Sequence, residues 1–424
     1  MLKAYEYRIY PTPQQEVQLN KTLGLCRLYY NTVVFNKKQN MKMPIEGYFQ
    51  TFTKYKPEAL EWVKEVDSVP LSQTWSDVTK AYNNFFKSCK KQRAGFSGEP
   101  QFKSKKCGKD GLRYSSSGFK GFVNGKLVLT RKLGPLEIRS SCRFCEGKIK
   151  NITIKKTATN KWFVKICVEK KDEPKNKNGK IVGIDWNCDD ESFVTMSNGT
   201  KVKCSRFLRQ SQKHLAHLQR NLERKKYALF FQKYGRMPDF KNSSDAKKFK
   251  EIPVSNNYEK QKLLVARAYE KVSWQRKDWL HKLSREICNQ YETVVVEDIN
   301  LQNMASNLHH GKVVGDQGFG MLRQMIAYKG HLEKVNPKNT SKMCHICRSI
   351  NQEVKVGVKH WNCPVCGANH DRDINAAINI LNKYASRRGE VGLGTTEITN
   401  ACGEPRSSMK QESSKPSSAF AEVS

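Results

Sequence analysis

The stretch CHICRSINQEVKVGVKHWNCPVCGANHDRDINAAINI, residues 344–380, decides how the rest of the chain is interpreted. It contains two Cys-x-x-Cys pairs, Cys344/Cys347 and Cys363/Cys366. Each pair can present two sulfurs on one side of a turn, and four thiolates at this spacing can surround Zn²⁺ as a tetrahedron. The alternative is four unligated cysteines, which the paired spacing disfavours. The sequence therefore predicts one structural zinc ion.

The charge of the chain points to a polyanionic partner. Its 424 residues include 76 Lys and Arg against 40 Asp and Glu, a formal net charge of +36. Such an excess repels itself unless a polyanion neutralises it, so nucleic acid is the leading partner and an acidic membrane surface is the rival. The sequence has no apolar run long enough to span a membrane and no charged-then-apolar leader, so we expect a soluble protein that is not secreted and has no membrane partner.

The N-terminal half predicts a β-rich domain with inserted helices. Residues 2–10 alternate as a strand does, and the period becomes helical over 14–40 and again over 67–87. Segments 148–156 and 161–169 alternate apolar residues with lysines on either side of a short turn. They indicate a hairpin with one buried and one cationic face, as half of a barrel or sandwich.

The second half is expected to form an α/β domain after a polar linker at 170–180. The expected strands lie at 181–187, 192–197, 292–296 and 331–336, with a strand-to-helix segment at 201–228 and a long helix that ends at 290. A polar stretch at 233–253 interrupts the helices, and the Gly-rich segment 311–320 is a candidate mobile lid. Residues 387–424 lack core-forming runs and are expected to be disordered.

Three carboxylates occupy positions that suggest a metal site. Asp185 and Glu297 end apolar strands, and Asp373 begins a helix. A carboxylate there is costly unless water, a cation or a metal satisfies it. Asp371 is a candidate cap for the following helix, and alternation turns Asp298 away from Glu297. Any one acid alone is more often a cap or a salt-bridged strand end, and spacing cannot join the three.

A series of motifs follows the order of a known family. They are AYEYRIYPTP from residue 4, RLYYN from 27, PQFKSK from 100, GID from 183, QRKDWLHKLS from 275, VEDIN from 296, the four cysteines, and RDINAAINI from 372. Together they cover nearly the whole chain, and the combination resembles the TnpB family encoded by bacterial insertion-sequence transposons. The resemblance implies an RNA-guided DNA endonuclease, similar to the small type V CRISPR effectors.

The resemblance also implies roles for single residues. Asp185, Glu297 and Asp373 match three catalytic acids of a RuvC site, which would bind two Mg²⁺ ions in an RNase H-like fold. The four cysteines match a zinc-binding insert within that domain. As readers of a short motif in duplex DNA we consider Lys54, Ser72 and Gln73, since polar side chains on a recognition lobe can reach base edges. Helix capping or surface solvation is the alternative for each.

The implied architecture is an α+β multidomain protein. Its expected parts are a wedge β-barrel (1–10 and 100–172), an inserted helical recognition lobe (11–99), a RuvC α/β domain (173–340 and 367–386), a zinc ribbon insert (341–366) and a disordered tail (387–424). The implied partners are a guide RNA, one protein per guide, and double-stranded target DNA beside the short motif. Base pairing would supply the sequence while the protein holds backbones, which accounts for the charge.

The chain departs from its relatives at Trp186-Asn187, where many have Leu-Gly. Asn tolerates left-handed geometry better than most residues, so the turn can be kept. Three other functions stay open at this point: a guided DNA-binding repressor without cleavage, an effector guided from a CRISPR array, and a transposase that acts without RNA. Retention of all three acids argues against the repressor, because binding alone does not need them.

Overall fold

The computed structural model describes most of the chain as two compact units, Met1–Glu173 with Asn221–Arg267, and Pro174–Arg220 with Ala268–Ser424. The residues described are 2–39, 65–90, 97–105, 111–130, 132–139, 147–170, 177–187, 191–299, 318–355 and 357–389. Three predictions fall outside the described residues: the part of the candidate lid before residue 318, the tail beyond residue 389, and Lys54. Among the described helices, none is both long and apolar enough to cross a membrane.

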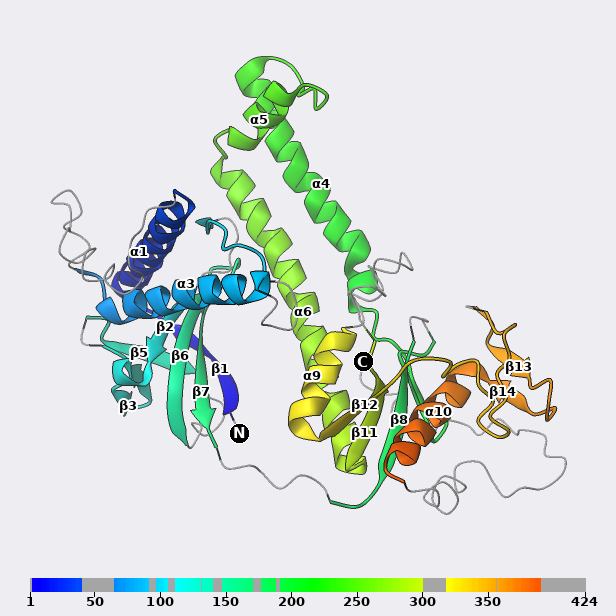
Figure 1. Cartoon of the computed structure of the whole chain (residues 1–424). Helices are drawn as coiled ribbons and strands as arrows, with labels where there is room; N and C mark the ends of the chain where they lie inside the picture. The colour runs from blue at the N-terminus through cyan, green and yellow to red at the C-terminus, as the bar shows by residue number, and fades with distance from the viewer. Residues whose placement is uncertain are drawn as a thin grey trace. The chain divides into compact units, whose positions relative to one another are not determined.

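The first unit contains a seven-stranded antiparallel sheet of order β2-β6-β7-β1-β5-β4-β3 (Figure 1). Its strands are β1 (Leu2–Tyr10), β2 (Leu112–Ser115), β3 (Gly121–Val123), β4 (Lys126–Val128), β5 (Pro135–Arg139), β6 (Lys148–Lys156) and β7 (Trp162–Glu169). The predicted hairpin forms from β6 and β7, and alternate residues of β7 are buried. Within the described residues, no strand pairing closes this sheet into a barrel.

Two helices share the core of that sheet. α1 (Pro13–Lys38) begins with a capping box between Thr12 and Gln15. α3 (Ser68–Cys89) is capped by the preceding Asp67, whose side chain accepts from the N–H of Val69. The buried stripe of α1 packs with the inward residues of the sheet in one hydrophobic cluster. Strands and helices thus occur where the change of period predicts them, and the structure packs both around one core.

A long pair of helices, α4 (Phe207–Tyr234) and α6 (Asn256–Gln290), is joined by α5 (Ser243–Glu251) (Figure 1). The sequence predicted only a polar interruption there, and the structure adds a helix. Asp245 accounts for it, because its buried carboxylate accepts from the Arg236 guanidinium at 2.8 Å and from the N–H of Asp239 at 3.0 Å. This ion pair holds the turn before α5 closed and lowers the pKa of Asp245 to about 2.

The second unit contains a mixed five-stranded sheet of order β10-β9-β8-β11-β12. Its strands are β8 (Ile181–Trp186), β9 (Val194–Met196), β10 (Lys201–Val202), β11 (Thr293–Glu297) and β12 (His331–Val335). β8, β9 and β10 pair antiparallel, whereas β11 runs parallel to both β8 and β12. The carboxyl ends of three parallel strands therefore meet at one edge of the sheet.

Helices cover both faces of this sheet. On one face, α6 and α9 (Phe319–Lys329) pack on a cluster that includes Val182, Ile184 and Val296. On the other face, α10 (Arg372–Arg387) packs on a smaller cluster with Val295. α10 comes so close to β8 that a Cβ on Gly183 would stand 2.2 Å from the carbonyl oxygen of Ala377. A glycine at this position of the strand is what lets the helix approach.

Candidate functional site

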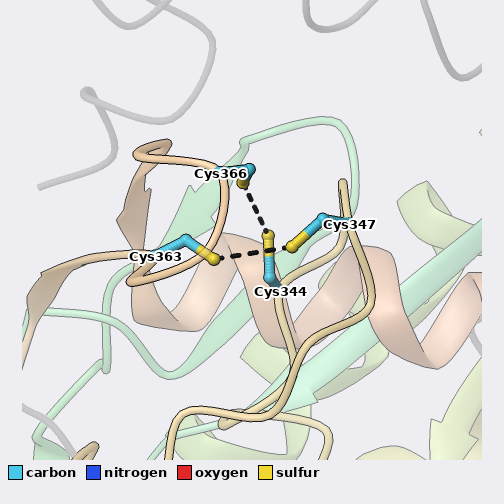
Figure 2. Close-up of side chains that lie close together, drawn as sticks. All are labelled: Cys344, Cys347, Cys363 and Cys366. Atoms are coloured by element: carbon cyan, nitrogen blue, oxygen red, sulfur yellow. Dashed lines mark hydrogen bonds between the residues drawn. The ribbon is translucent and has the colours of Figure 1, made fainter.

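The four cysteines come together as the sequence predicts. Their sulfurs all lie within 4.8 Å of one another, with Cys344 3.7 Å from Cys366 and Cys347 3.5 Å from Cys363 (Figure 2). A tetrahedron with Zn–S bonds of about 2.3 Å has sulfurs roughly 3.8 Å apart, so the spacing fits Zn²⁺. A bound zinc ion would be held by thiolates alone, which suits a structural rather than a catalytic role.

The two knuckles that carry the cysteines have the same backbone. In each, the residue four positions after the first cysteine donates its N–H to the carbonyl of that cysteine, Arg348 to Cys344 and Gly367 to Cys363. Both of these residues have positive φ, 63° at Arg348 and 69° at Gly367. The second knuckle meets this requirement with glycine, while the first forces an arginine into the left-handed region.

A histidine on β14 (Asn369–Asp371) supports the thiolate cluster from inside. His370 is 2% exposed, and its Nε2 lies 3.1 Å from the Cys344 sulfur. Burial and the neighbouring His345 lower the pKa of His370 to about 4, so the ring is neutral at pH 7. With its proton on Nε2 the ring donates to the thiolate. Trp361 of β13 (His360–Asn362) packs on the same ring at 4.7 Å.

Two asparagines of α10 fasten the first knuckle to the helix. Asn375 and Asn379 are four positions apart, each is 1% exposed, and both donate to the carbonyl of Met343, at 2.8 Å and 2.6 Å. The side-chain oxygen Oδ1 of Asn375 also accepts from the backbone N–H of His345 at 3.0 Å. Residues on either side of Cys344 are thus bonded to the helix that carries Asp373.

Side-chain alternation places two of the predicted acids on the face covered by α10. On β8, Val182, Ile184 and Trp186 point toward α6 and α9, so Asp185 points the other way. On β11, Glu297 has the same parity as Val295, which packs beside α10. α10 itself brings Asp373. The three predicted acids therefore converge on one side of the sheet, at the carboxyl ends of β8 and β11.

The acids influence one another electrostatically. Burial, then the charges of Glu297 and Asp373, raise the pKa of Asp185 well above its usual value, against an opposing effect of Arg372. Burial raises the pKa of Glu297, which is 6% exposed, while Thr340 and Lys383 oppose the rise. Among the described residues, their oxygens are not gathered as tightly as the four sulfurs. The three acids thus lie close enough to act on one another, and burial disfavours ionisation of both Asp185 and Glu297.

The beginning of α10 is fixed by the neighbour of Asp373. Asp371 caps the helix as predicted, since its Oδ1 accepts from the N–H groups of Asp373 and Ile374 at 3.1 Å each. Burial alone would raise the pKa of Asp371, but hydrogen bonds from Lys201 and from these N–H groups hold it below its usual value. Ser192 Oγ lies 3.3 Å from Asp373 Oδ2. Asp298, also as predicted, turns outward and pairs with Lys334 at 2.8 Å.

Trp186 and Asn187 are built into the fold without a left-handed turn. Trp186 is buried, with its ring centroid 5.7 Å from that of Phe319. The N–H of Asn187 donates to the carbonyl of Phe193, and its side chain donates to Thr195 Oγ1 at 3.1 Å. Asn187 does not have positive φ, so the left-handed geometry considered for it is wrong. A side-chain hydrogen bond, and not backbone tolerance, holds this position.

The candidate motif readers Ser72 and Gln73 belong to the other unit. Ser72 is exposed and Gln73 is half-buried, both on α3 of the other unit, and Lys54 lies outside the described residues. Sequence reasoning assigned no role to Thr340, His370, Asn375 or Asn379, although all are buried and polar. The signal for the two asparagines was their spacing of four on a helix beside the zinc motif.

The fold and site define a mixed α/β protein with a carboxylate centre and a four-cysteine ribbon. Residues 319–380 match the family described as "Cas12f1-like, TNB domain", 242–308 match "Probable transposase", and 1–43 match "Helix-turn-helix domain". A "Putative RNA-guided DNA endonuclease" of Streptomyces pristinaespiralis is 30% identical over 97% of this chain and 96% of its own. The chain belongs to the TnpB family.

Other relatives extend this comparison. The "Putative RNA-guided DNA endonuclease InsQ" of Escherichia coli K12 is 27% identical, over 90% of this chain and 92% of that protein. A solved complex of Cas12f1 with sgRNA and target DNA covers 90% of this chain and 98% of its own, at 14% identity and a TM-score of 0.45.

Proposed function

We propose that this protein is a guide-RNA-dependent DNA endonuclease whose site is formed by Asp185, Glu297 and Asp373. The observation that carries the proposal is the convergence of these carboxylates from two parallel strands and a helix, in a chain of the TnpB family. Relatives that span nearly the whole chain are described as RNA-guided DNA endonucleases. The protein would act in the bacterial cytoplasm or nucleoid, where its DNA target is.

The proposed metal is Mg²⁺, and the chain supplies what that ion prefers. Carboxylate oxygens are hard ligands, and burial raises the pKa values of Asp185 and Glu297, so a bound cation would offset the cost of ionising them. Two Mg²⁺ ions would supply an activated water and stabilise the leaving 3′ oxygen of a phosphodiester. The zinc ion would have a structural and not a catalytic role.

The proposed domain layout draws on the strand order. The five-stranded sheet has three antiparallel strands followed by two parallel ones, with helices on both faces, which supports an RNase H-like RuvC domain over 173–340 and 367–386. The ribbon at 341–366 is then an insert of that domain. We propose the seven-stranded sheet as the wedge and residues 11–99 as the recognition lobe, where Ser72 and Gln73, with Lys54, are candidate readers of duplex DNA.

The proposed partners are one guide RNA and double-stranded target DNA. The net charge of +36 is suited to holding both backbones, while guide pairing supplies the target sequence. Because the protein would read shape in the guide, its residues do not distinguish a transposon-end RNA from a CRISPR-array RNA.

The experiment that tests the proposal is expression of the chain with flanking genomic DNA, followed by sequencing of RNA that co-purifies. The complex is then incubated with a guide-matched plasmid library carrying random flanks, with and without Mg²⁺, beside an Asp185→Ala control. We expect a discrete RNA and Mg²⁺-dependent loss of plasmids with one flanking motif. Bound RNA without cutting would replace the nuclease by a guided DNA-binding protein, and absence of a discrete RNA would refute guidance.

A further inference from the structure

Glu297 has a neutral hydrogen-bond donor beside it. The hydroxyl of Thr340 donates to Glu297 Oε1, and both residues are buried, with exposures of 5% and 6%. Such a bond to an ionised carboxylate is charge-assisted and stronger than one between neutral groups. It opposes the effect of burial on the pKa of Glu297. Thr340 therefore fixes one oxygen of Glu297 and leaves the other for the site.

Thr340 is itself held by α10. Asn379 donates to the carbonyl of Thr340 at 2.8 Å as well as to that of Met343, and Asn379 is 1% exposed. Met343 directly precedes Cys344, the buried thiol of the cluster. A continuous set of buried hydrogen bonds thus runs from Glu297 through Thr340 and Asn379 to the first zinc knuckle.

We propose that Thr340 is a positioning residue for Glu297, and that Asn379 and the zinc knuckle hold Thr340 in place. The inference rests on the proposed nuclease function for its activity readout. In this arrangement the ribbon does more than stabilise its own fold, because a shift of the Thr340–Met343 segment removes the hydrogen bond that orients Glu297. Partners that orient a metal-binding carboxylate typically change metal affinity or activity by about 10–100-fold when they are removed.

The central test compares Thr340→Val with Thr340→Ser. Valine keeps the shape and removes the hydroxyl, whereas serine keeps the hydroxyl. We expect Thr340→Val to lower Mg²⁺-dependent cleavage at saturating DNA by about 10–100-fold. Guide binding and zinc content should not change. Thr340→Ser should keep most of the wild-type activity. Thr293→Val, at the other end of β11 and equally buried, is the control for loss of a buried hydroxyl and should cleave normally.

The pH profile separates positioning from a loss of stability. Lys383 on α10 opposes the rise in the pKa of Glu297, and Glu297 in turn raises the pKa of Asp185 on β8; both of these charged groups remain in the variant. Without the Thr340 hydrogen bond the pKa of Glu297 rises, so the acidic limb of the cleavage profile should move to higher pH. An unchanged profile in Thr340→Val, or a Thr340→Ser as inactive as the valine variant, would overturn the inference.

A measurement without nucleic acid distinguishes this inference from the proposed function. The rise in Tm on adding Mn²⁺ or Mg²⁺ to the zinc-loaded protein should be smaller in Thr340→Val than in wild type. If wild type fails to cut DNA, the nuclease proposal fails, and the inference is decided by this shift. Should Thr340→Val not fold, Asn379→Leu, which loosens Thr340 from α10, must reduce the same shift, and an unaltered shift contradicts the inference.

Discussion

Asp185 and Glu297 keep their carboxylates in a setting that resists ionisation. A carboxyl group whose pKa is raised in the folded state binds protons more tightly there than in the unfolded chain. Folding stability is therefore lost as the pH rises from the unfolded pKa, near 4, through the raised values. Divalent cations would remove this penalty by neutralising the carboxylates. The site is thus expected to make the divalent-free protein less stable at pH 7 than at mildly acidic pH.

Replacement of Asp185 by asparagine should show this cost directly. In Mg²⁺-free buffer with zinc retained, Asp185→Asn should raise Tm at pH 7, by about 2–4 °C for each kcal/mol gained in unfolding free energy. The fall of Tm as the pH rises above 4 should also become less steep. Cleavage should be abolished at the same time. Thermal unfolding from pH 4 to pH 8 checks the expectation, which a lower Tm at pH 7 would refute.

Gly183 controls the distance between the acids on the sheet and the acid on the helix. Gly183→Ala places a Cβ against the Ala377 carbonyl, so α10 must move away with Asp373. We expect a loss of about 1–3 kcal/mol in unfolding free energy and reduced cleavage. Gly24→Ala in α1 is the matched control, because nothing lies within 4 Å of the new methyl group. Gly24→Ala should stabilise the protein by up to about 1 kcal/mol. Equal effects of Gly183→Ala and Gly24→Ala would contradict the role of Gly183 in the approach of α10 to β8.

At the scale of elements, the two knuckles of the ribbon differ in one respect. Both need a residue with positive φ after the cysteine turn, and only the second has glycine. The element was predictable from its cysteine spacing, since chain geometry dictates which sulfurs can meet. The left-handed conformation of Arg348 could not be predicted, because the sequence does not say which turn residue adopts positive φ.

Arg348→Gly should therefore strengthen the first knuckle. Glycine relieves the strain of a left-handed non-glycine residue, which stabilises the folded protein by about 1 kcal/mol. Part of this gain is lost, because glycine also makes the unfolded chain more flexible. We expect slower zinc loss to a chelator and an equal or higher Tm. Arg285→Gly, in the second-last turn of α6, should instead destabilise the protein by about 1 kcal/mol. Faster zinc loss from Arg348→Gly would show that the side chain matters more than the backbone.

The strands, the long helices and both candidate sites follow from periodicity, spacing and family likeness. Alternation alone explains why Asp185 and Glu297 share a face, once their strands are parallel neighbours. Thr340 and Asn379 could not be predicted, because their partners lie 43 and 39 residues away and depend on how α10 packs. α5 was missed because a polar segment gives no apolar stripe, and the ion pair between exposed Arg236 and buried Asp245 that organises it has no sequence signature.

For the whole molecule, the charge of +36 predicts binding to nucleic-acid backbones that depends steeply on salt. If the protein contacts several phosphates of its guide, raising the salt from 50 to 200 mM should weaken RNA affinity by roughly 10³-fold or more. Titration of the purified guide at several salt concentrations measures the slope. A flat dependence would mean that the basic surface does not hold the RNA backbone.

The most direct test of the central claim is plasmid cleavage by wild type and Glu297→Gln, each loaded with the same guide RNA. Glutamine keeps the size of the side chain and removes the charge that would bind Mg²⁺. We predict that wild type cuts the guide-matched plasmid only when Mg²⁺ is present, while Glu297→Gln binds the same DNA and leaves it intact. Cutting by Glu297→Gln at the wild-type rate would contradict the assignment of the carboxylate centre.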